Sequence, residues 1–431
     1  MAEMSVEKIS TRDAKLWRAI MIWACGGLFY CYQFIFRVSP SVMTEDLRIA
    51  FDANAFQIGN LSSYYYIAYA MLQIPIGLLL DRYGPRKMLT LSCLMCTVGG
   101  IVFANAYTMP VASVGRFLMG AGSSCAFIGT LKLATLWFPL ERVGFAAGVT
   151  MLLGFMGAAA GSPLAILIEH FGWREVIYLI SLGGVLLSLI IWGIVRDAPK
   201  EKLALLKEAS EGQSLLFGLI KVISTPQVWL LAIYGCLMYV PIAAFADLWG
   251  VSFISKVYDV DRKIAAAMVS LVYVGAALGG PILAGLSDRL VSRRFPMILG
   301  ASATLVLYII VIYTSSIPQP LMFVLMFLAG FFFTGQVLCF AAVCEQIPVS
   351  VSGVGVGFTN MIVMMSGVIF EPLVGFFLDQ SAVQSGSAPG IYSIADYPFA
   401  LMSIPLMILI ALILSKWFIR ETHPRLKQKA R

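Results

Sequence analysis

Five charged residues lie within long apolar stretches of the sequence, where charge is unusual. They are Arg37, Arg116, Lys132, Asp247 and Glu371. An ionised side chain in a hydrocarbon environment costs at least about 2.5 kcal/mol, so such residues are rare and are usually functional. Guanidinium groups bind carboxylates and phosphates, and a positioned carboxyl group can transfer a proton. These residue types therefore indicate anion binding combined with proton transfer.

Arg37 shares a helical face with two other polar residues. Tyr30, Gln33 and Arg37 occupy positions i, i+3 and i+7 of one helix. This stripe suits a small polar or anionic solute, because arginine offers a bidentate fork to carboxylate or phosphate. The alternative is that Arg37 extends to the membrane interface beside Ser39 and Pro40.

Tyrosines cluster in two of the apolar stretches, at 64–69 and at 234–239. In a cavity they hydrogen-bond a solute, whereas at the membrane surface they form an aromatic belt. Three consecutive tyrosines cannot all face inward, so we expect one tyrosine from each cluster in the site. The predicted solute-binding residues are Tyr30, Gln33, Arg37, Tyr65, Tyr239 and Asn360.

Glu371 is the first candidate for a proton carrier. Asn360, Gly367 and Glu371 lie at i, i+7 and i+11, so they share one face, and burial there favours the protonated carboxyl group. The alternative is an ion pair with Arg37 or Arg116. Asp247 is the second candidate, and it could instead lie at the outer boundary of its helix.

Other classes of chemistry lack their motifs. No G-x-x-x-x-G-K-[ST] loop is present, and the two histidines, His170 and His423, lie near expected loops. Cys93 and Cys96 lie within one apolar stretch without a second cysteine pair, which favours buried small side chains over a metal or redox site. We therefore expect no enzyme activity, no ATP-driven pump, no metal and no cofactor.

The composition is that of an integral membrane protein. Of the 431 residues, 60% are hydrophobic and 12% are charged, whereas soluble domains carry roughly 25% charged residues. The net charge of +7 is dispersed among loops, so it does not indicate nucleic-acid binding. Twelve apolar runs approach the roughly 20 residues that span a bilayer: 17–41, 56–80, 88–107, 110–136, 142–168, 173–195, 227–254, 263–286, 295–315, 318–343, 351–378 and 397–419.

The distribution of lysine and arginine predicts the orientation. Basic residues gather in the loops on one side, together with both termini, and that side is expected to be cytoplasmic. The loops on the other side hold Arg48, Arg174, Lys256, Arg262 and Lys263. The compact loops favour a bacterial inner membrane.

The chain divides into two similar halves. Asp81-Arg82 returns as Asp288-Arg289, and Pro163 of the fifth span returns as Pro372 of the eleventh, at separations of about 208 residues. The polar stretch 196–226, with an expected amphipathic helix at 203–219, separates them. We therefore predict an all-α membrane protein with twelve transmembrane helices in two pseudo-symmetric six-helix bundles, 1–195 and 227–431, joined by a cytoplasmic linker.

The motifs resemble those of the major facilitator superfamily. The stretch from Gly77 to Lys87 reads G-L-L-L-D-R-Y-G-P-R-K and is similar to the signature loop of that family. Arg116 and Gly120 resemble its fourth-span R-x-x-x-G element. The resemblance implies alternating access around a central site. It also implies that Arg116 acts in proton coupling, together with Asp247 and Glu371, or has a structural role.

The resemblance further implies a cytoplasmic gate that stabilises the outward-facing state. Its expected residues are Gly77, Asp81, Arg82, Gly84, Arg86, Asp288 and Arg289. Within the family, the sequence around Arg37 and Lys132 looks similar to bacterial sugar-phosphate and organic-anion permeases. This implies uptake of a small polar or anionic solute with protons by a monomer in the lipid bilayer. Uptake of amino acids or small peptides, efflux of drugs or siderophores, and a non-transporting receptor remain alternatives.

Overall fold

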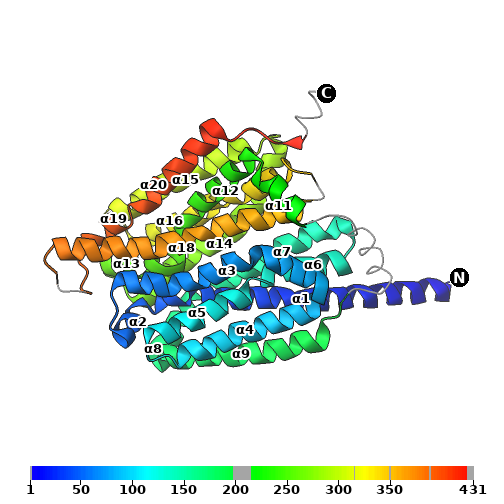
Figure 1. The fold of residues 1–431 in the computed structure, drawn as a ribbon, viewed down its shortest axis with the longest axis horizontal. Helices are drawn as coiled ribbons and strands as arrows, with labels where there is room; N and C mark the ends of the chain where they lie inside the picture. Colours follow the sequence, from blue (N-terminus) through cyan, green and yellow to red (C-terminus); the bar gives the residue numbers. More distant parts are fainter. Residues whose placement is uncertain (1, 198–214, 315, 349–350, 388–389, 425–431) are drawn as a thin grey trace.

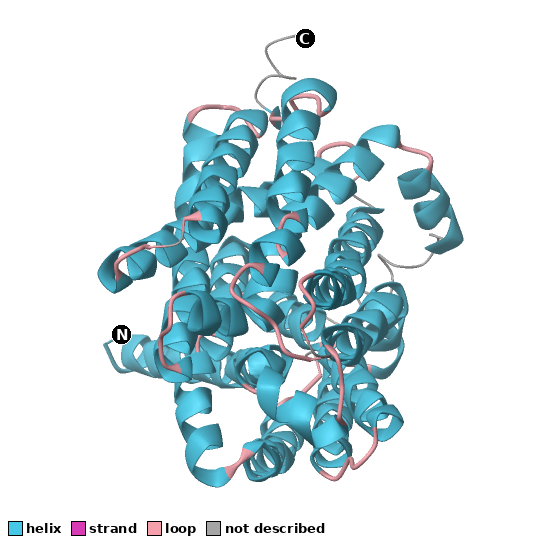
Figure 2. Cartoon of the chain, turned by 90° about the vertical axis from the view of Figure 1, so that its left-hand side faces the viewer, coloured by secondary structure: helices cyan, strands magenta, loops and turns pink. Residues whose placement is uncertain are grey.

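The computed structural model describes residues 2–424 except 198–214, 315, 349–350 and 388–389. Every regular element that it describes is a helix (Figure 2). In chain order these are α1 (Ala2–Val42), α2 (Thr44–Phe51), α3 (Ala55–Tyr83), α4 (Pro85–Ala104), α5 (Met109–Ser123), α6 (Ala126–Trp137), α7 (Leu140–Ala158), α8 (Gly161–Phe171), α9 (Trp173–Ile194), α11 (Leu215–Ile223), α12 (Pro226–Val240), η1 (Pro241–Trp249), α13 (Gly250–Val257), α14 (Arg262–Arg289), α15 (Arg294–Tyr313), α16 (Gln319–Phe333), η2 (Thr334–Val337), α17 (Leu338–Cys344), α18 (Ser352–Gln384), α19 (Asp396–Ala400), α20 (Ser403–Ile413) and η4 (Leu414–Phe418).

The described helices form twelve stretches that are long and apolar enough to cross a membrane, as the sequence predicts. Several spans consist of more than one helix. The seventh span is α12, the π-helix η1 and α13, and η1 begins at Pro241. Proline has no backbone N–H, so it interrupts the i→i−4 hydrogen bonds of an α-helix at this point. The described part of the chain is thus an all-α membrane protein, as predicted.

The spans lie in two groups, which we call the N-half (α1 to α9) and the C-half (α11 to η4). In Figure 1 the N-half lies below and the C-half above, and the first turns of α1 project at the right. We call that end of the bundle the terminal end and the opposite end, with α2, α8 and α19, the distal end. The division into two bundles with a linker stays a prediction, and 198–214 of the linker lie outside the described residues.

The halves meet most extensively where α3 packs against α18 (Figure 1). Glycine makes this close approach possible. A Cβ atom added to Gly59 of α3 would lie 2.7 Å from the Cα atom of Pro372, and one added to Gly375 of α18 would overlap the carbonyl group of Ala55. Within the N-half, a Cβ at Gly120 would likewise overlap the backbone carbonyl of Tyr65. Small residues therefore set the distance between helices, as is typical of membrane bundles.

Polar contacts also join the halves at the distal end. Asp46 pairs with Arg262 at 2.5 Å, and Glu169 pairs with Lys263 at 3.0 Å. The Asp379 carboxylate of α18 accepts hydrogen bonds from the first two backbone amides of α3, at 3.1 and 2.9 Å. Among the described residues, the hydrogen bonds and ion pairs between the halves lie at this end and in the middle of the bundle. The distal end is therefore the closed end of this conformation.

Candidate functional site

An ion pair between the halves lies in the middle of the bundle. Arg37 comes from α1 and Asp247 from the π-helix η1, and the Arg37 Nε atom lies 2.9 Å from the Asp247 Oδ2 atom. The side chains are 3% and 0% exposed, respectively. The pair is therefore removed from solvent on both sides, and each charge needs the other, because an unpaired buried charge is very costly.

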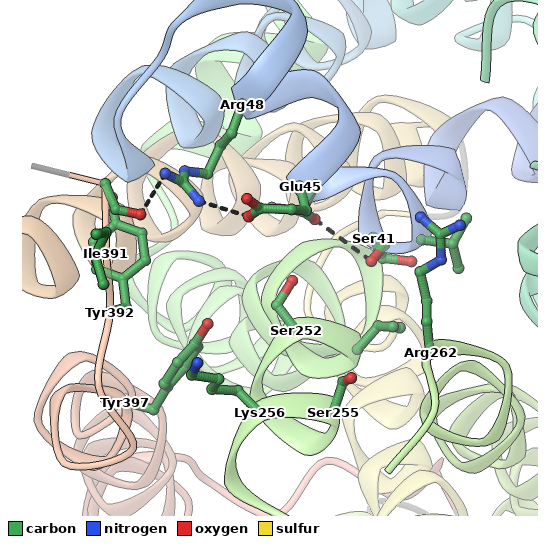
Figure 3. Close-up of a pocket in the computed structure, with 14 residues that line it drawn as sticks. Ser41, Glu45, Arg48, Ser252, Ser255, Lys256, Arg262, Ile391, Tyr392 and Tyr397 are labelled. Carbon is green, nitrogen blue, oxygen red and sulfur yellow. Dashed lines mark hydrogen bonds and ion pairs between the residues drawn. The ribbon is translucent and has the colours of Figure 1, made fainter. Parts of the chain in front are cut away.

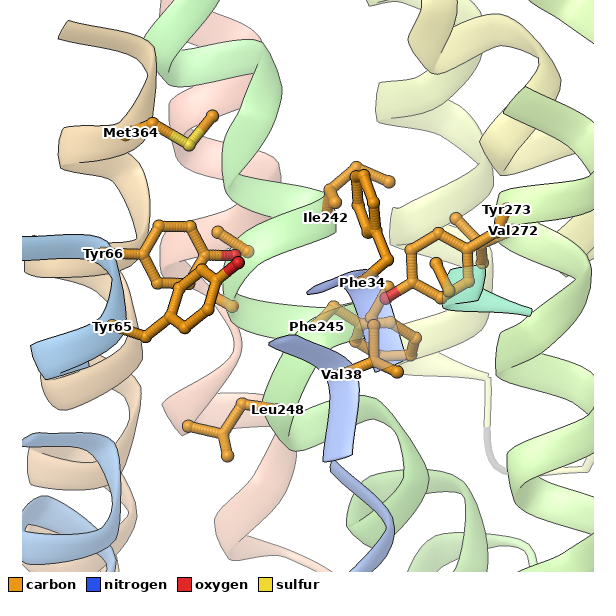
Figure 4. Close-up of a cluster of buried hydrophobic side chains, with 14 of the residues drawn as sticks. Phe34, Val38, Tyr65, Tyr66, Ile242, Phe245, Leu248, Val272, Tyr273 and Met364 are labelled. Carbon is orange, nitrogen blue, oxygen red and sulfur yellow. The ribbon is translucent and has the colours of Figure 1, made fainter. Parts of the chain in front are cut away.

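Three tyrosine hydroxyls complete this pair. Tyr66 of α3 accepts hydrogen bonds from the Arg37 Nη2 and Nε atoms, at 2.8 and 3.2 Å, and donates to the Asp247 carboxylate. Tyr239 of α12 accepts from the Arg37 Nη2 atom at 2.8 Å. Tyr273 of α14 donates to the other Asp247 carboxylate oxygen. Figure 4 shows Tyr66 and Tyr273 entering the buried cluster from opposite sides.

Aromatic rings surround the guanidinium group. The Arg37 Cζ atom lies 4.7 Å from the ring centre of Tyr66, 5.2 Å from that of Phe34 and 5.4 Å from that of Tyr239. Cation–π contacts of this kind stabilise a cation that has lost its water. The site thus holds one cation with strong partners, and it is built from both halves. Any solute anion that binds the guanidinium group competes with Asp247.

The other predicted solute-binding residues lie around this centre but bond elsewhere. The Tyr65 hydroxyl donates to Gln33 at 2.5 Å, and the tyrosine of its cluster that contacts Arg37 is Tyr66. The predicted role of Tyr65 in solute binding stays a prediction. The Tyr30 ring packs on Phe34 and Phe127. Asn360 of α18 donates to Gln73 of α3 at 2.8 Å, and this contact also crosses between the halves.

Arg116 lies in a second buried polar group. Its guanidinium group is fully buried and donates to the backbone carbonyls of Phe36 at 2.8 Å and Ser62 at 3.4 Å. It also lies over the Tyr65 ring, at 5.0 Å. The Nε atom has no hydrogen-bond partner. Carbonyl oxygens, rather than the carboxylate considered from the sequence, therefore hold this cation.

Glu371 is fully buried, and neither of its carboxylate oxygens has a hydrogen-bond partner. Its backbone carbonyl accepts a hydrogen bond from the Trp249 indole at 2.9 Å. The alternative of a Glu371 ion pair with Arg37 or Arg116 is not found, because Arg37 pairs with Asp247 and Arg116 bonds to carbonyl groups. An ionised carboxylate in such surroundings is costly unless it gains a partner.

The predicted gate residues contact their own half in this conformation. Asp81 pairs with Lys132 at 2.8 Å, so Lys132 binds the signature loop instead of facing the central site. Arg86 donates to the Trp192 carbonyl and stacks on its ring at 4.2 Å. Gly84 has a φ of +78°, which favours glycine at the turn between α3 and α4.

The corresponding loop of the C-half, which contains Asp288 and Arg289, also makes its contacts within its own half. Asp288 pairs with Arg293 at 2.7 Å, while Arg82, Arg289 and the Asp288 side chain are exposed. A Cβ at Gly77 would meet nothing within 4 Å. The role of the seven gate residues in a conformation closed at the terminal end stays a prediction.

Nearby, Glu421 stabilises the terminal end of the C-half. Burial raises the pKa of the Glu421 carboxyl group, but hydrogen bonds from the Ser292 hydroxyl and from the amides of Arg293, Arg294 and His423 outweigh it. The net result is a pKa below the usual glutamate range.

Sequence reasoning missed the tyrosine hydroxyls of Tyr66 and Tyr273 and the pairing of Asp247. Asp247 is fully buried beside Arg37, so the alternative that it lies at the outer boundary of its helix is wrong. One signal in the sequence was available, because a buried carboxylate and a buried guanidinium group each lower the cost of the other when they pair. Tyr273 carried no such signal, since it is one of many tyrosines.

Comparisons with known proteins agree on the kind of molecule. The family model described as Major Facilitator Superfamily matches residues 22–371 and 250–431. The probable sulfoacetate transporter SauU of Cupriavidus necator is 26% identical over 302 residues, which cover 66% of this chain and 68% of that protein. The membrane sensor protein UhpC of Salmonella typhimurium is 26% identical over 377 residues, 80% of this chain and 82% of that protein. The solved D-xylose-proton symporter shares the fold, with a TM-score of 0.70 at 16% identity over 94% of this chain and 98% of that one.

Proposed function

The chain belongs to the Major Facilitator Superfamily of transporters, and from this premise we propose that it takes up a small polar or anionic metabolite together with protons. Alternating access would proceed by rocking of two six-helix domains, 1–195 and 227–431, about the site around Arg37. The terminal end is cytoplasmic in this proposal, as the basic loops indicate. The closed distal end then makes this the inward-facing state of a bacterial inner-membrane protein.

The observation that carries the proposal is the Arg37 guanidinium group held between the halves. It is buried, paired with Asp247 and bonded to the Tyr66 and Tyr239 hydroxyls. A carboxylate, sulfonate or phosphate of a solute has the same charge as Asp247 and suits the same fork. Solute binding would therefore replace Asp247, and the contacts between the halves would change with it.

Protons enter the proposal through the two buried carboxyl groups. Asp247 loses its cation when a solute anion occupies Arg37, and protonation would then neutralise it. Glu371 has no donor on either oxygen, which supports a carboxyl group that carries a proton in this state. Arg116 is the other fully buried arginine among the described residues, and we propose that it acts in proton coupling with these two acids.

The names of two relatives favour different functions for this protein. SauU is named as a probable sulfoacetate transporter, and sulfoacetate is a small dianion, which supports an anionic solute here. UhpC is named as a membrane sensor, which supports the alternative of a solute receptor that does not transport. Uptake into proteoliposomes separates these two functions, because a sensor binds solute without moving it.

The experiment begins with thermal unfolding of the purified protein against a panel of solutes at acidic and neutral pH. The panel contains sugar phosphates, carboxylates, sulfonates, amino acids, dipeptides and siderophores. A ligand at 100 times its Kd adds about 2.7 kcal/mol of stability. Hits are then tested for uptake driven by an inward proton gradient.

We expect stabilisation by anions that disappears in Arg37→Ala and persists in Arg174→Ala. Arg174 is a suitable control, because it binds the carbonyls of Ala104 and Ala106 away from the centre. Stabilisation by zwitterions or bulky apolar compounds alone would refute the anion proposal and favour peptide uptake or efflux. Binding without uptake would favour the receptor.

A further inference from the structure

A cavity of about 400 Å³ lies between the halves at the distal end (Figure 3). Its walls come from 41–48 of the N-half and from 251–262 and 390–397 of the C-half. None of the residues around Arg37 lines it, so it is separate from the central site. Because both halves form its walls, the cavity exists only while the distal end is closed.

The cavity is basic. Of its lining residues, Arg48, Lys256 and Arg262 are cationic and Glu45 is acidic. These three cations are drawn from the five basic residues that the sequence places in the loops on this side. Their gathering around one cavity is therefore not a general property of this surface, where basic residues are few.

Two of the cations have acidic partners, and one does not. Arg48 pairs with Glu45 at 2.5 Å, and Arg262 pairs with Asp46 at 2.5 Å. The exposed Lys256 forms no ion pair with a described residue. The cavity thus presents a cation without a counter-charge, and such a charge attracts an anion from solution.

Further hydrogen-bond donors in the cavity lack partners. The Arg48 Nε atom is buried without a hydrogen bond, although the rest of that guanidinium group binds Glu45 and the Gly390 carbonyl. The hydroxyls of Ser252 and Tyr397 make no hydrogen bond to a described residue, and Figure 3 shows them near Lys256. The Arg48 Nε atom is itself inaccessible from the cavity, whereas the two hydroxyls remain accessible to a ligand. An oxyanion supplies both acceptors and negative charge.

We propose that this cavity binds a small oxyanion, such as phosphate, and that the bound anion stabilises the closed distal end. Lys256 supplies the charge from α13, Ser252 and Tyr397 supply hydroxyl donors, and Arg48 lines the cavity from α2. A ligand that binds only one conformation shifts the population toward it. The anion would therefore oppose opening of the distal end. This proposal is independent of the solute that binds at Arg37.

The experiment measures hydrogen exchange of the purified full-length protein by mass spectrometry. Inorganic phosphate is the probe, and sodium gluconate at equal ionic strength is the reference. The variants are Lys256→Gln, the control Arg174→Gln and Arg37→Ala. Arg174 is a matched control, because it is a cation of the same end that does not line the cavity and that bonds only to carbonyls of its own half, those of Ala104 and Ala106.

We expect phosphate to slow exchange at 44–54 and 251–257 in a saturable manner. Lys256→Gln should raise the phosphate concentration that gives half of the protection at least tenfold, whereas Arg174→Gln should not change it. Arg37→Ala should keep the effect, which separates this cavity from the central site. No saturable protection in the wild type, or equal protection in Lys256→Gln, would overturn the proposal.

Discussion

The buried ion pair between Arg37 and Asp247 allows a quantitative test by a double-mutant cycle. The cycle consists of Arg37→Gln, Asp247→Asn and the double variant. Each single variant leaves one charge buried at 3% or less exposure without its partner. Breaking a buried pair in this way costs about 3–5 kcal/mol. We expect each single variant to lose stability of that size.

The double variant removes both charges and therefore leaves no uncompensated ion. Its hydrogen bonds with Tyr66, Tyr239 and Tyr273 become bonds between neutral groups, which are weaker than bonds to charged groups. A hydrogen bond contributes about 0.5–1.5 kcal/mol net to stability, so the loss at each tyrosine is at most of this size. The double variant should thus be no less stable than the worse single variant. The coupling free energy is then on the order of several kcal/mol.

The assay is unfolding in detergent by denaturant, read as a free energy for all four proteins. The control cycle uses Asp81→Asn and Lys132→Gln, whose ion pair has a similar length of 2.8 Å but side chains 65% and 33% exposed. Exposed pairs contribute about 0–1 kcal/mol, so this coupling should be small. If the stability losses of Arg37→Gln and Asp247→Asn simply add in the double variant, the two charges do not depend on each other, and the predicted coupling is refuted.

Three further predictions concern packing, pH and the distal contacts. Gly120→Ala should lower the Tm, because the added methyl group overpacks the contact with Tyr65 at a cost of about 1–3 kcal/mol. The control Gly183→Ala should not lower the Tm, because a Cβ atom there meets nothing within 4 Å. Equal Tm values for the two variants would contradict the close packing at Gly120. The pKa of Glu421 is lowered in the folded protein, so its carboxylate stabilises the fold fully above the usual glutamate pKa of about 4.3, and this stabilisation is lost as the pH falls through the lower folded-state value. The difference in Tm between the wild type and Glu421→Gln should therefore narrow on acidification. A difference that stays constant with pH would exclude stabilisation by the Glu421 carboxylate. Asp379→Asn should speed hydrogen exchange at 54–57, because it weakens the cap that the Asp379 carboxylate forms on the first amides of α3, worth about 1 kcal/mol. The control Asp259→Asn, at an exposed residue, should leave this exchange unchanged. Similar exchange in both variants would show that this cap does not hold the halves together.

The spans could be predicted from the sequence because a bilayer imposes their length and composition. The second span, expected at 56–80, is α3 at Ala55–Tyr83, and the third, expected at 88–107, is α4 at Pro85–Ala104. The differences lie at the ends, where the apolar core of the membrane no longer determines the residue type. The internal charges were also recognisable, since a charge in an apolar run is visible in the sequence alone.

The partners of those charges could not be predicted. Arg37 and Asp247 are 210 residues apart, and which acid meets which arginine depends on how the halves pack. Pro241 begins a π-helix through Trp249, so the spacing of 100° per residue does not apply between Tyr239 and Asp247. Tyr65 and Tyr66 are adjacent, and the sequence does not say which of them faces Arg37.

The two buried acids of the C-half have opposite surroundings, and this difference is the basis for assigning them different roles. Asp247 pairs with a guanidinium group and accepts hydrogen bonds from two tyrosine hydroxyls. Glu371 is also fully buried, but neither of its carboxylate oxygens has a hydrogen-bond partner. Opening of the distal end would separate α3 from α18 and expose Glu371 to water, because its carbonyl lies against Gly59 of α3. In the function that we propose, the same motion would let Glu371 exchange its proton on that side, and Asp247 would respond to the solute at Arg37.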